Sequence, residues 1–158
     1  MKAQKKVILS FVVIGVLFIQ ACTKSLVIKN VDYAQKIESV LTPDSDGNIS
    51  DIRYGISFSI LPFQFEEFKD SSSVQISEIR MIRNNLGYYF ITAESFKNVY
   101  VMAPNKGELK LEKKIQVNEN GLYSPVFNLR VSVVELIENS KNIILLNEKG
   151  ILKEEVTS

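Results

Sequence analysis

The sequence has no histidine, no tryptophan and a single cysteine among its 158 residues. Without histidine, the chain lacks the side chain whose ordinary pKa lies nearest neutrality. This excludes serine–histidine and cysteine–histidine catalysis and histidine-ligated metal centres. The 19 lysines and arginines are balanced by 18 acids, for a net charge of +1. No nucleic-acid partner is expected, because neutralising many phosphates requires a local excess of basic side chains.

The short motifs of nucleotide-binding and hydrolytic enzymes are also missing. The sequence contains no G-x-S-x-G, G-x-x-x-x-G-K-[ST], G-x-G-x-x-G or S-x-x-K. Carboxylates remain as candidates for acid–base catalysis, since two with separated pKa values suffice for glycoside hydrolysis. The candidates are Asp44, Asp46, Asp51, Glu66, Glu67, Glu154 and Glu155. Adjacent carboxylates face opposite sides of a strand, so we predict a non-enzyme with no catalytic residues and no cofactor.

The amino terminus has the outline of an export signal. Three basic residues, Lys2, Lys5 and Lys6, precede an uncharged and largely apolar run over residues 7–19. As a helix this run would extend about 20 Å, short of the roughly 30 Å of hydrocarbon that a transmembrane helix crosses. The run ends at Ile19-Gln20-Ala21-Cys22, where the chain has its only cysteine.

This four-residue segment resembles the lipobox of bacterial lipoproteins, in which an aliphatic residue, a tolerant position and a small residue precede an obligatory cysteine. The resemblance implies that residues 1–21 are a signal peptide, cleaved between Ala21 and Cys22. It implies that Cys22 then carries a diacylglyceryl group and an acylated amino group (palmitate), which would anchor the protein to a membrane of the cell envelope. Thr23 stands where an aspartate tends to retain such lipoproteins in the inner membrane, so the resemblance points to the outer membrane. It leaves open whether the protein occupies the leaflet that faces the periplasm. The alternatives are an ordinary cleaved signal and an uncleaved anchor.

Beyond this segment, hydrophobic and polar residues alternate with the period of a strand that buries one face. Residues 52–60 and 127–133 are predicted to be such strands. Turn sequences rich in Asn and Gly separate the apolar runs at regular spacing, and no pattern typical of a long helix lies between them. The sequence therefore predicts an all-β fold, either an antiparallel two-sheet sandwich of immunoglobulin-like architecture or a small β-barrel.

Removing residues 1–21 leaves 137 residues, enough for one independent core. We predict a lipidated N-terminus with a tether or arm over residues 22–48, followed by a β-sandwich domain over residues 49–158. Alternatively, residues 26–28 form a strand and the domain begins near residue 26. Residues 31–41 also fit the spacing of a short helix, with an irregular arm as the alternative.

Five aromatic residues are candidates for a binding surface: Phe63, Phe65, Phe68, Tyr88 and Tyr89. Aromatic side chains dominate interface energetics. However, a strand that continued after Pro62 would place Phe63 and Phe65 in the core, where most phenylalanines lie. Since neighbours in a strand face opposite ways, at least one of the two tyrosines is expected to point away from the core.

A weak candidate for a calcium site follows Pro43, where four side chains offer oxygen ligands: Asp44, Asp46, Asn48 and Asp51. Calcium takes six to eight oxygens, and an EF-hand loop has glycine at its sixth position and glutamate at its twelfth. Counted from Asp44, Gly47 is at the fourth position and another glycine is at the twelfth, so the register does not fit. An acidic surface turn is favoured, and no metal is predicted.

These observations favour a lipid-anchored, non-enzymatic cell-envelope protein that binds or positions another envelope component. Its expected partners are the membrane, through the lipid on Cys22, and an envelope protein. One alternative is a module that captures a glycan or peptide in a groove walled by the aromatic residues. Another is an inhibitor or immunity-type lipoprotein, for which no particular residue argues.

Overall fold

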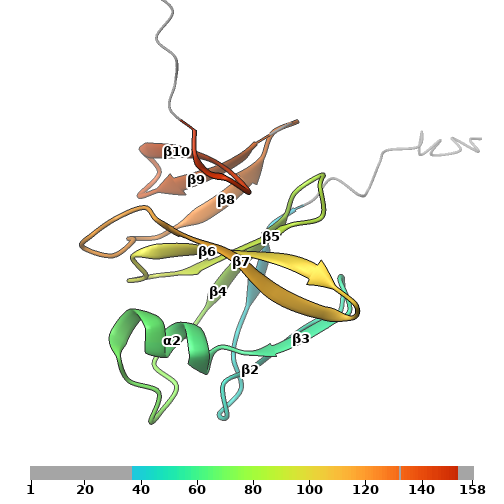
Figure 1. The fold of residues 1–158 in the computed structure, drawn as a ribbon. Helices are drawn as coiled ribbons and strands as arrows, with labels where there is room; N and C mark the ends of the chain where they lie inside the picture. The colour runs from blue at the N-terminus through green and yellow to red at the C-terminus, as the bar shows by residue number, and fades with distance from the viewer. Residues whose placement is uncertain (1–36, 132, 153–158) are drawn as a thin grey trace, which may run out of the picture. The chain divides into compact units, whose positions relative to one another are not determined.

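A computed structural model describes residues 37–131 and 133–152 of the chain. These residues form short strands and one helix, α2 (Leu61–Phe68), which lies between β3 and β4 (Figure 1). The strands are β1 (Ser39–Leu41), β2 (Asn48–Asp51), β3 (Ile56–Ser59), β4 (Ile79–Arg83), β5 (Tyr89–Ala93), β6 (Asn98–Asn105), β7 (Glu108–Gln116), β8 (Val126–Leu129), β9 (Val134–Glu138), β10 (Asn142–Asn147) and β11 (Gly150–Ile151).

The strands pair antiparallel in three sheets. The five-stranded sheet has the order β1-β4-β5-β6-β7, the four-stranded sheet has the order β11-β10-β9-β8, and β2 pairs with β3. Neither of the larger sheets closes on itself, so the predicted all-β sandwich is confirmed and the barrel alternative is excluded. Turn sequences rich in Asn and Gly do reverse the chain, as at residues 84–88 between β4 and β5.

One face of the five-stranded sheet packs against the four-stranded sheet (Figure 1). Phe90, Val99 and Val101 from the larger sheet share a buried cluster with Phe127 and Leu136 from the smaller one. Burial of such side chains is the main favourable term in folding. This cluster is the interior of the predicted sandwich.

The opposite face of the five-stranded sheet is also covered, by the β2–β3 hairpin and by α2. Ile49 of β2 and Ile60 before α2 are buried there with Met81, Ile91 and Tyr100. Because both faces are covered, all five residues of β5 are buried. The five-stranded sheet is therefore the middle layer, and period-two exposure does not apply to its central strand.

The prediction that a strand continues through Phe63 and Phe65 is wrong, since both residues lie in α2. Pro62 stands in the first turn of the helix, where its missing amide hydrogen costs nothing and its fixed φ suits the helix. Lys69 ends the helix in the left-handed conformation, at φ 60°, and its amide donates to the carbonyl of Phe65. The helical spacing was hidden because the aromatic residues also alternate with polar ones.

The predicted strand over residues 52–60 is a turn followed by β3. The Asp51 carboxylate accepts the amide of Arg53 at 2.8 Å, and Gly55 has φ +63°, so the chain reverses over residues 52–55. The predicted strand over residues 127–133 is also shorter, because a turn between Arg130 and Val133 follows β8. Ile52 and Val131 share the alternating pattern but lie in exposed turns.

The first described strand, β1, lies within the segment predicted as a tether or arm. It pairs with β4, with Ser39 opposite Met81 and Leu41 opposite Ile79. The folded domain thus includes residues ahead of 49, and Ser39 to Leu41 form a strand where a short helix was also considered. The alternative first strand at residues 26–28 lies outside the described residues.

Candidate functional site

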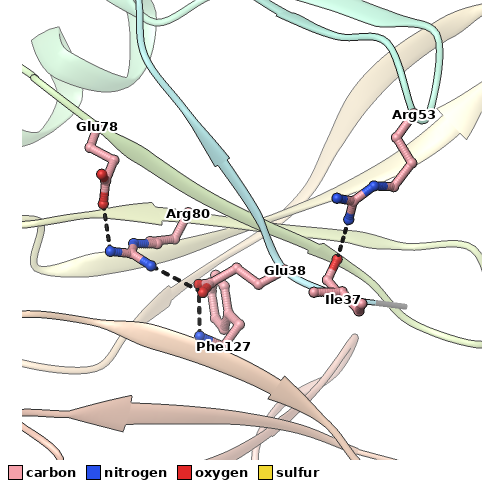
Figure 2. Close-up of polar contacts among 6 residues, drawn as sticks. All are labelled: Ile37, Glu38, Arg53, Glu78, Arg80 and Phe127. Atoms are coloured by element: carbon pink, nitrogen blue, oxygen red, sulfur yellow. Dashed lines mark hydrogen bonds and ion pairs between the residues drawn. The ribbon is translucent and has the colours of Figure 1, made fainter. Parts of the chain in front are cut away.

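A network of hydrogen bonds and ion pairs holds residues 37 and 38, at the start of the described domain, against the rest of the fold (Figure 2). Glu38 reaches from the start of β1 to both larger sheets. One carboxylate oxygen lies 3.2 Å from an Arg80 guanidinium nitrogen on β4, and the other accepts the Phe127 amide of β8 at 2.8 Å. Arg80 also pairs with Glu78 at 2.5 Å. β8 is an edge strand, so its outer side has no neighbouring strand to accept a hydrogen bond from the Phe127 amide. Glu38 provides that acceptor.

The Glu38 carboxylate is largely withdrawn from water. Desolvation raises its pKa above the ordinary value, and the Phe127 amide and the Arg80 guanidinium offset that rise only in part. The charged form of Glu38 therefore costs free energy in the folded state. The network joins the segment before β1 to both larger sheets.

Two further contacts hold the same segment. The Arg53 guanidinium donates to the Ile37 carbonyl at 2.8 Å (Figure 2). The Ser39 hydroxyl donates to the buried Asp51 carboxylate at 2.5 Å. Residues 37–39 are therefore bonded by side chains to β2, β4, β8 and the β2–β3 turn.

A groove of about 500 Å³ lies between the β2–β3 hairpin and the β6–β7 hairpin. Its apolar wall includes Phe58, Phe63, Tyr89, Met102 and Leu109. Its polar lining is contributed by Ser57, Asn105, Lys106 and Glu108. This volume is within the range of small-ligand sites, which are mostly apolar with a few polar groups.

Edge-to-face aromatic contacts build the wall of this groove. The Phe63 ring centroid lies 6.0 Å from that of Phe58 and 4.8 Å from that of Tyr100. Tyr89 contacts Tyr54 in the same geometry, at 5.5 Å. Such pairs prefer edge-on packing because of the ring quadrupole. The wall is thus supported from behind by other rings.

Helix α2 is held against the sheet by buried polar side chains. Gln64 is fully buried and makes three hydrogen bonds, to the carbonyls of Asp70 and Ser73 and from the amide of Gln75. Glu67 accepts the Lys97 amide at 2.7 Å, the Asn98 side chain at 2.8 Å and the Tyr100 hydroxyl at 2.7 Å. These bonds connect α2 to the start of β6 and give Glu67 a structural role.

Tyr100 shows the electrostatic effect of this arrangement. Burial raises the pKa of its hydroxyl, and the Glu67 carboxylate that accepts its hydrogen bond raises the pKa further. The Tyr100 hydroxyl therefore stays protonated at neutral pH and donates to Glu67.

The structure divides the five predicted aromatic residues among different environments. Phe63 and Tyr89 line the groove, whereas Phe68 packs on Phe96 at 5.9 Å. Phe65 is half exposed beside Lys69. Tyr88 packs against the cluster between the two larger sheets. The tyrosines do face opposite ways, but both of those faces are covered.

For several residues of the groove, nothing in the sequence indicated a place in a binding site. Met102, Lys106 and Leu109 come from a hairpin that the sequence indicated only as a turn flanked by apolar runs. Their approach to β3 depends on pairing between segments distant in the chain. Only Phe63 and Tyr89 could be proposed beforehand, on their aromatic character.

The candidate metal residues form an acidic turn. The Asp44 carboxylate accepts the amides of Asp46 and Asn48 and the Asn48 side chain. These bonds, chiefly that from the Asn48 amide, lower the pKa of Asp44. Asp51 instead bonds Ser39 and Arg53. Across residues 37–131 and 133–152, no three acidic or cysteine side chains gather as metal ligands.

The predicted cleavage and lipidation residues, Ala21 and Cys22, lie outside the described residues. Within the part of the chain that the structure describes, no helix is long and apolar enough to cross a membrane. In comparisons with known proteins, no family model, no curated protein and no solved structure matches this chain.

Proposed function

We propose that this chain is a lipid-anchored, non-enzymatic cell-envelope protein that binds or positions another envelope component. The observation that carries the proposal is the position of its only cysteine, Cys22, directly after an apolar run that closes on Ile19-Gln20-Ala21. The domain that follows is consistent with a binding role. The carboxylates of Glu38 and Glu67 accept hydrogen bonds from the Phe127 amide and the Tyr100 hydroxyl, respectively.

Mass spectrometry of the protein from its native membranes tests the anchoring. We expect a mature chain that begins at Cys22 and carries lipid on the sulfur. A Cys22→Ala variant should keep the mass of the uncleaved chain and lose the lipid, because sulfur is the group that accepts it. An unmodified sulfur, or a mature start elsewhere, would refute the proposal.

A matched variant tests the expected location. Thr23→Asp should shift the lipidated protein from outer-membrane to inner-membrane fractions without changing the lipid on Cys22. Thr23→Ser, which introduces no charge, should leave the distribution unchanged. A wild-type protein already found in the inner membrane would refute the outer-membrane assignment alone.

A second candidate function is capture of a glycan or peptide, which the aromatic-walled groove favours. Ser57 lines this groove on β3 and is exposed. A Ser57→Trp variant should fill part of the groove and weaken capture of such a ligand from arrays. Ser50→Trp, in the paired position of β2 outside the groove lining, is its control. Equal binding by both variants would refute the groove as the site.

A further inference from the structure

The most exposed apolar side chains of the described residues gather at one end of the domain. They are Ile52, Val131, Leu86 and Ile37, with exposed fractions of 94%, 91%, 70% and 66%. No other large hydrophobic residue in 37–131 and 133–152 is as exposed as these four. We call this the Ile37 end, formed by Ile37 and the turns at 52–55, 84–88, 106–107 and 130–133.

Hydrogen bonds and strand register bring these positions together. The Ile37 carbonyl accepts the side chain of Arg53, from the turn that contains Ile52 (Figure 2). Since Ser39 lies opposite Met81 in an antiparallel pair, the chain before Ser39 runs toward the β4–β5 turn, which contains Leu86. In that turn, the Asn85 side chain donates to the Val131 carbonyl at 2.8 Å.

The β6–β7 hairpin extends to the same end. Met102 pairs with Tyr89, the first residue of β5, so residues 103–105 of β6 continue beyond the start of β5. The tip of the hairpin therefore places Lys106 near the turns that carry the exposed apolar residues.

Charge separates the two ends of the domain. The turns of the Ile37 end contain three basic residues, Arg53, Lys106 and Arg130, and no acids. Arg130 pairs with the buried Glu135 at 2.5 Å, and the exposed Glu108 follows the turn at 106–107. At the end of β4, the Arg83 guanidinium lies 5.5 Å from the Tyr89 ring centroid. Its buried Nε has no hydrogen-bond partner among the described residues. The opposite end carries mostly acids in α2 and the turns at 42–47 and 94–97: Asp44, Asp46, Glu66, Glu67 and Glu94.

The chain that leads back to Cys22 leaves the domain at the basic end. The 15 residues from Cys22 to Lys36 could extend at most about 50 Å, which keeps Ile37 within reach of the bilayer. They carry three lysines, Lys24, Lys29 and Lys36, against one acid, Asp32. Basic segments next to a membrane are attracted to anionic lipids.

We propose that the Ile37 end docks on an anionic lipid surface, with Leu86 and Val131 entering the headgroup boundary and the basic side chains facing lipid phosphates. The inference rests on the proposed lipid anchor at Cys22. Exposed apolar side chains surrounded by basic ones are suited to such an interface. The apolar side chains are buried at the boundary of the acyl chains, and the basic ones are attracted to the anionic headgroups.

The absence of tryptophan from the chain makes the orientation directly measurable. Leu86→Trp and Val131→Trp variants of the full lipidated protein would each carry one tryptophan at the Ile37 end. Tyr123→Trp is the matched control, at an exposed position beyond the opposite end of β9. The variants are reconstituted into vesicles of phosphatidylcholine with or without phosphatidylglycerol.

We expect blue-shifted emission, and quenching by brominated acyl chains, for Leu86→Trp and Val131→Trp in phosphatidylglycerol vesicles. Tyr123→Trp should emit as in water. A Lys106→Glu change added to Leu86→Trp should reduce the blue shift, whereas Lys97→Glu at the acidic end should not. Equal quenching of all three tryptophans, or of none, would overturn the proposed orientation.

The anchor is checked in the same preparation. Lipidated Cys22 with unquenched tryptophan at position 86 would overturn the docking and leave the anchor intact. Sulfur without lipid would refute the anchor. In that case binding of the Leu86→Trp chain to phosphatidylglycerol vesicles, measured by sedimentation, decides the docking, and no binding would overturn it.

Discussion

Glu38, directly before β1, connects the five-stranded sheet to the four-stranded sheet. Its two carboxylate oxygens have different partners, a guanidinium on β4 and an amide on β8. The hydrogen bond to Phe127 needs only an acceptor, whereas the pair with Arg80 needs a charge. These two requirements can be separated by substitution.

We predict that Glu38→Ala lowers the free energy of unfolding by about 1–3 kcal/mol, because the Phe127 amide loses its acceptor. Glu38→Gln keeps an oxygen acceptor and removes the desolvated charge, so it should cost much less. Denaturant titrations at neutral pH compare the two variants. Equal losses would show that the ion pair, and not the amide, is what Glu38 contributes.

The raised pKa of Glu38 also predicts a pH dependence. Between the ordinary value near 4.5 and the raised value in the fold, the folded state retains a proton that the unfolded chain has lost. The contribution of Glu38 to stability therefore falls as the pH rises through this window. Unfolding titrations from pH 4 to pH 7 should show Glu38→Gln gaining stability relative to the wild type, and a constant difference would contradict the assignment.

At the scale of elements, α2 is a short helix whose position depends on buried polar bonds. A helix of eight residues is marginal by itself in water. Gln64 fixes it to the chain that follows, and Glu67 fixes it to β6. The helix covers the sheet, so these bonds maintain the second hydrophobic cluster.

We predict that Gln64→Leu destabilises the domain by about 1–3 kcal/mol, although it introduces an apolar residue into a buried position. The Ser73 carbonyl and the Gln75 amide would lose their partners. Glu66→Gln on the exposed side of α2 removes an ion pair with Lys114 and should leave the stability nearly unchanged, because exposed ion pairs contribute little. Thermal unfolding measures both, and a neutral Gln64→Leu would mean that water replaces these bonds.

The strands and turns were more predictable than the helix because their signals are local. The alternation of apolar and polar residues and the turns that contain Asn or Gly indicated the all-β class. The sheets themselves form by pairing of strands, some of them distant in the chain. Ile52 and Val131 misled the strand boundaries, since alternation cannot distinguish the end of a strand from an exposed turn. Gln64 gave no signal, because its role depends on a loop that returns to it.

At the scale of the whole molecule, the five-stranded sheet belongs to two hydrophobic clusters at once. Adjacent residues of β5 contribute to opposite clusters, as Phe90 and Ile91 do. Sequence reasoning reached a two-sheet sandwich but not the third layer. The residues of β3 and α2 were predicted as one extended stretch that bends at Pro62, and no strand was predicted at β2. The groove formed by that layer was therefore also missed.

We predict that Phe90→Ala and Ile91→Ala each destabilise the entire domain, by about 3–5 and 2–5 kcal/mol. Both should retain a single unfolding transition, because the two clusters share one sheet. Ile143→Ala, at a half-exposed position of β10, is the control and should shift stability by about 0.5 kcal/mol or less. Two separate transitions in calorimetry would show that the clusters unfold independently.

The fastening at residues 37–39 has a mechanical consequence for a lipid-anchored chain. A force between bilayer and domain would act first on Ile37. The hydrogen bonds of Ile37, Glu38 and Ser39 would distribute it to the β2–β3 turn, to β8 and to β2. Along the strand axis, such a load shears the three-residue pairing of β1 with β4 instead of peeling it open. Loosening these side-chain bonds would therefore lower the force at which the domain first yields.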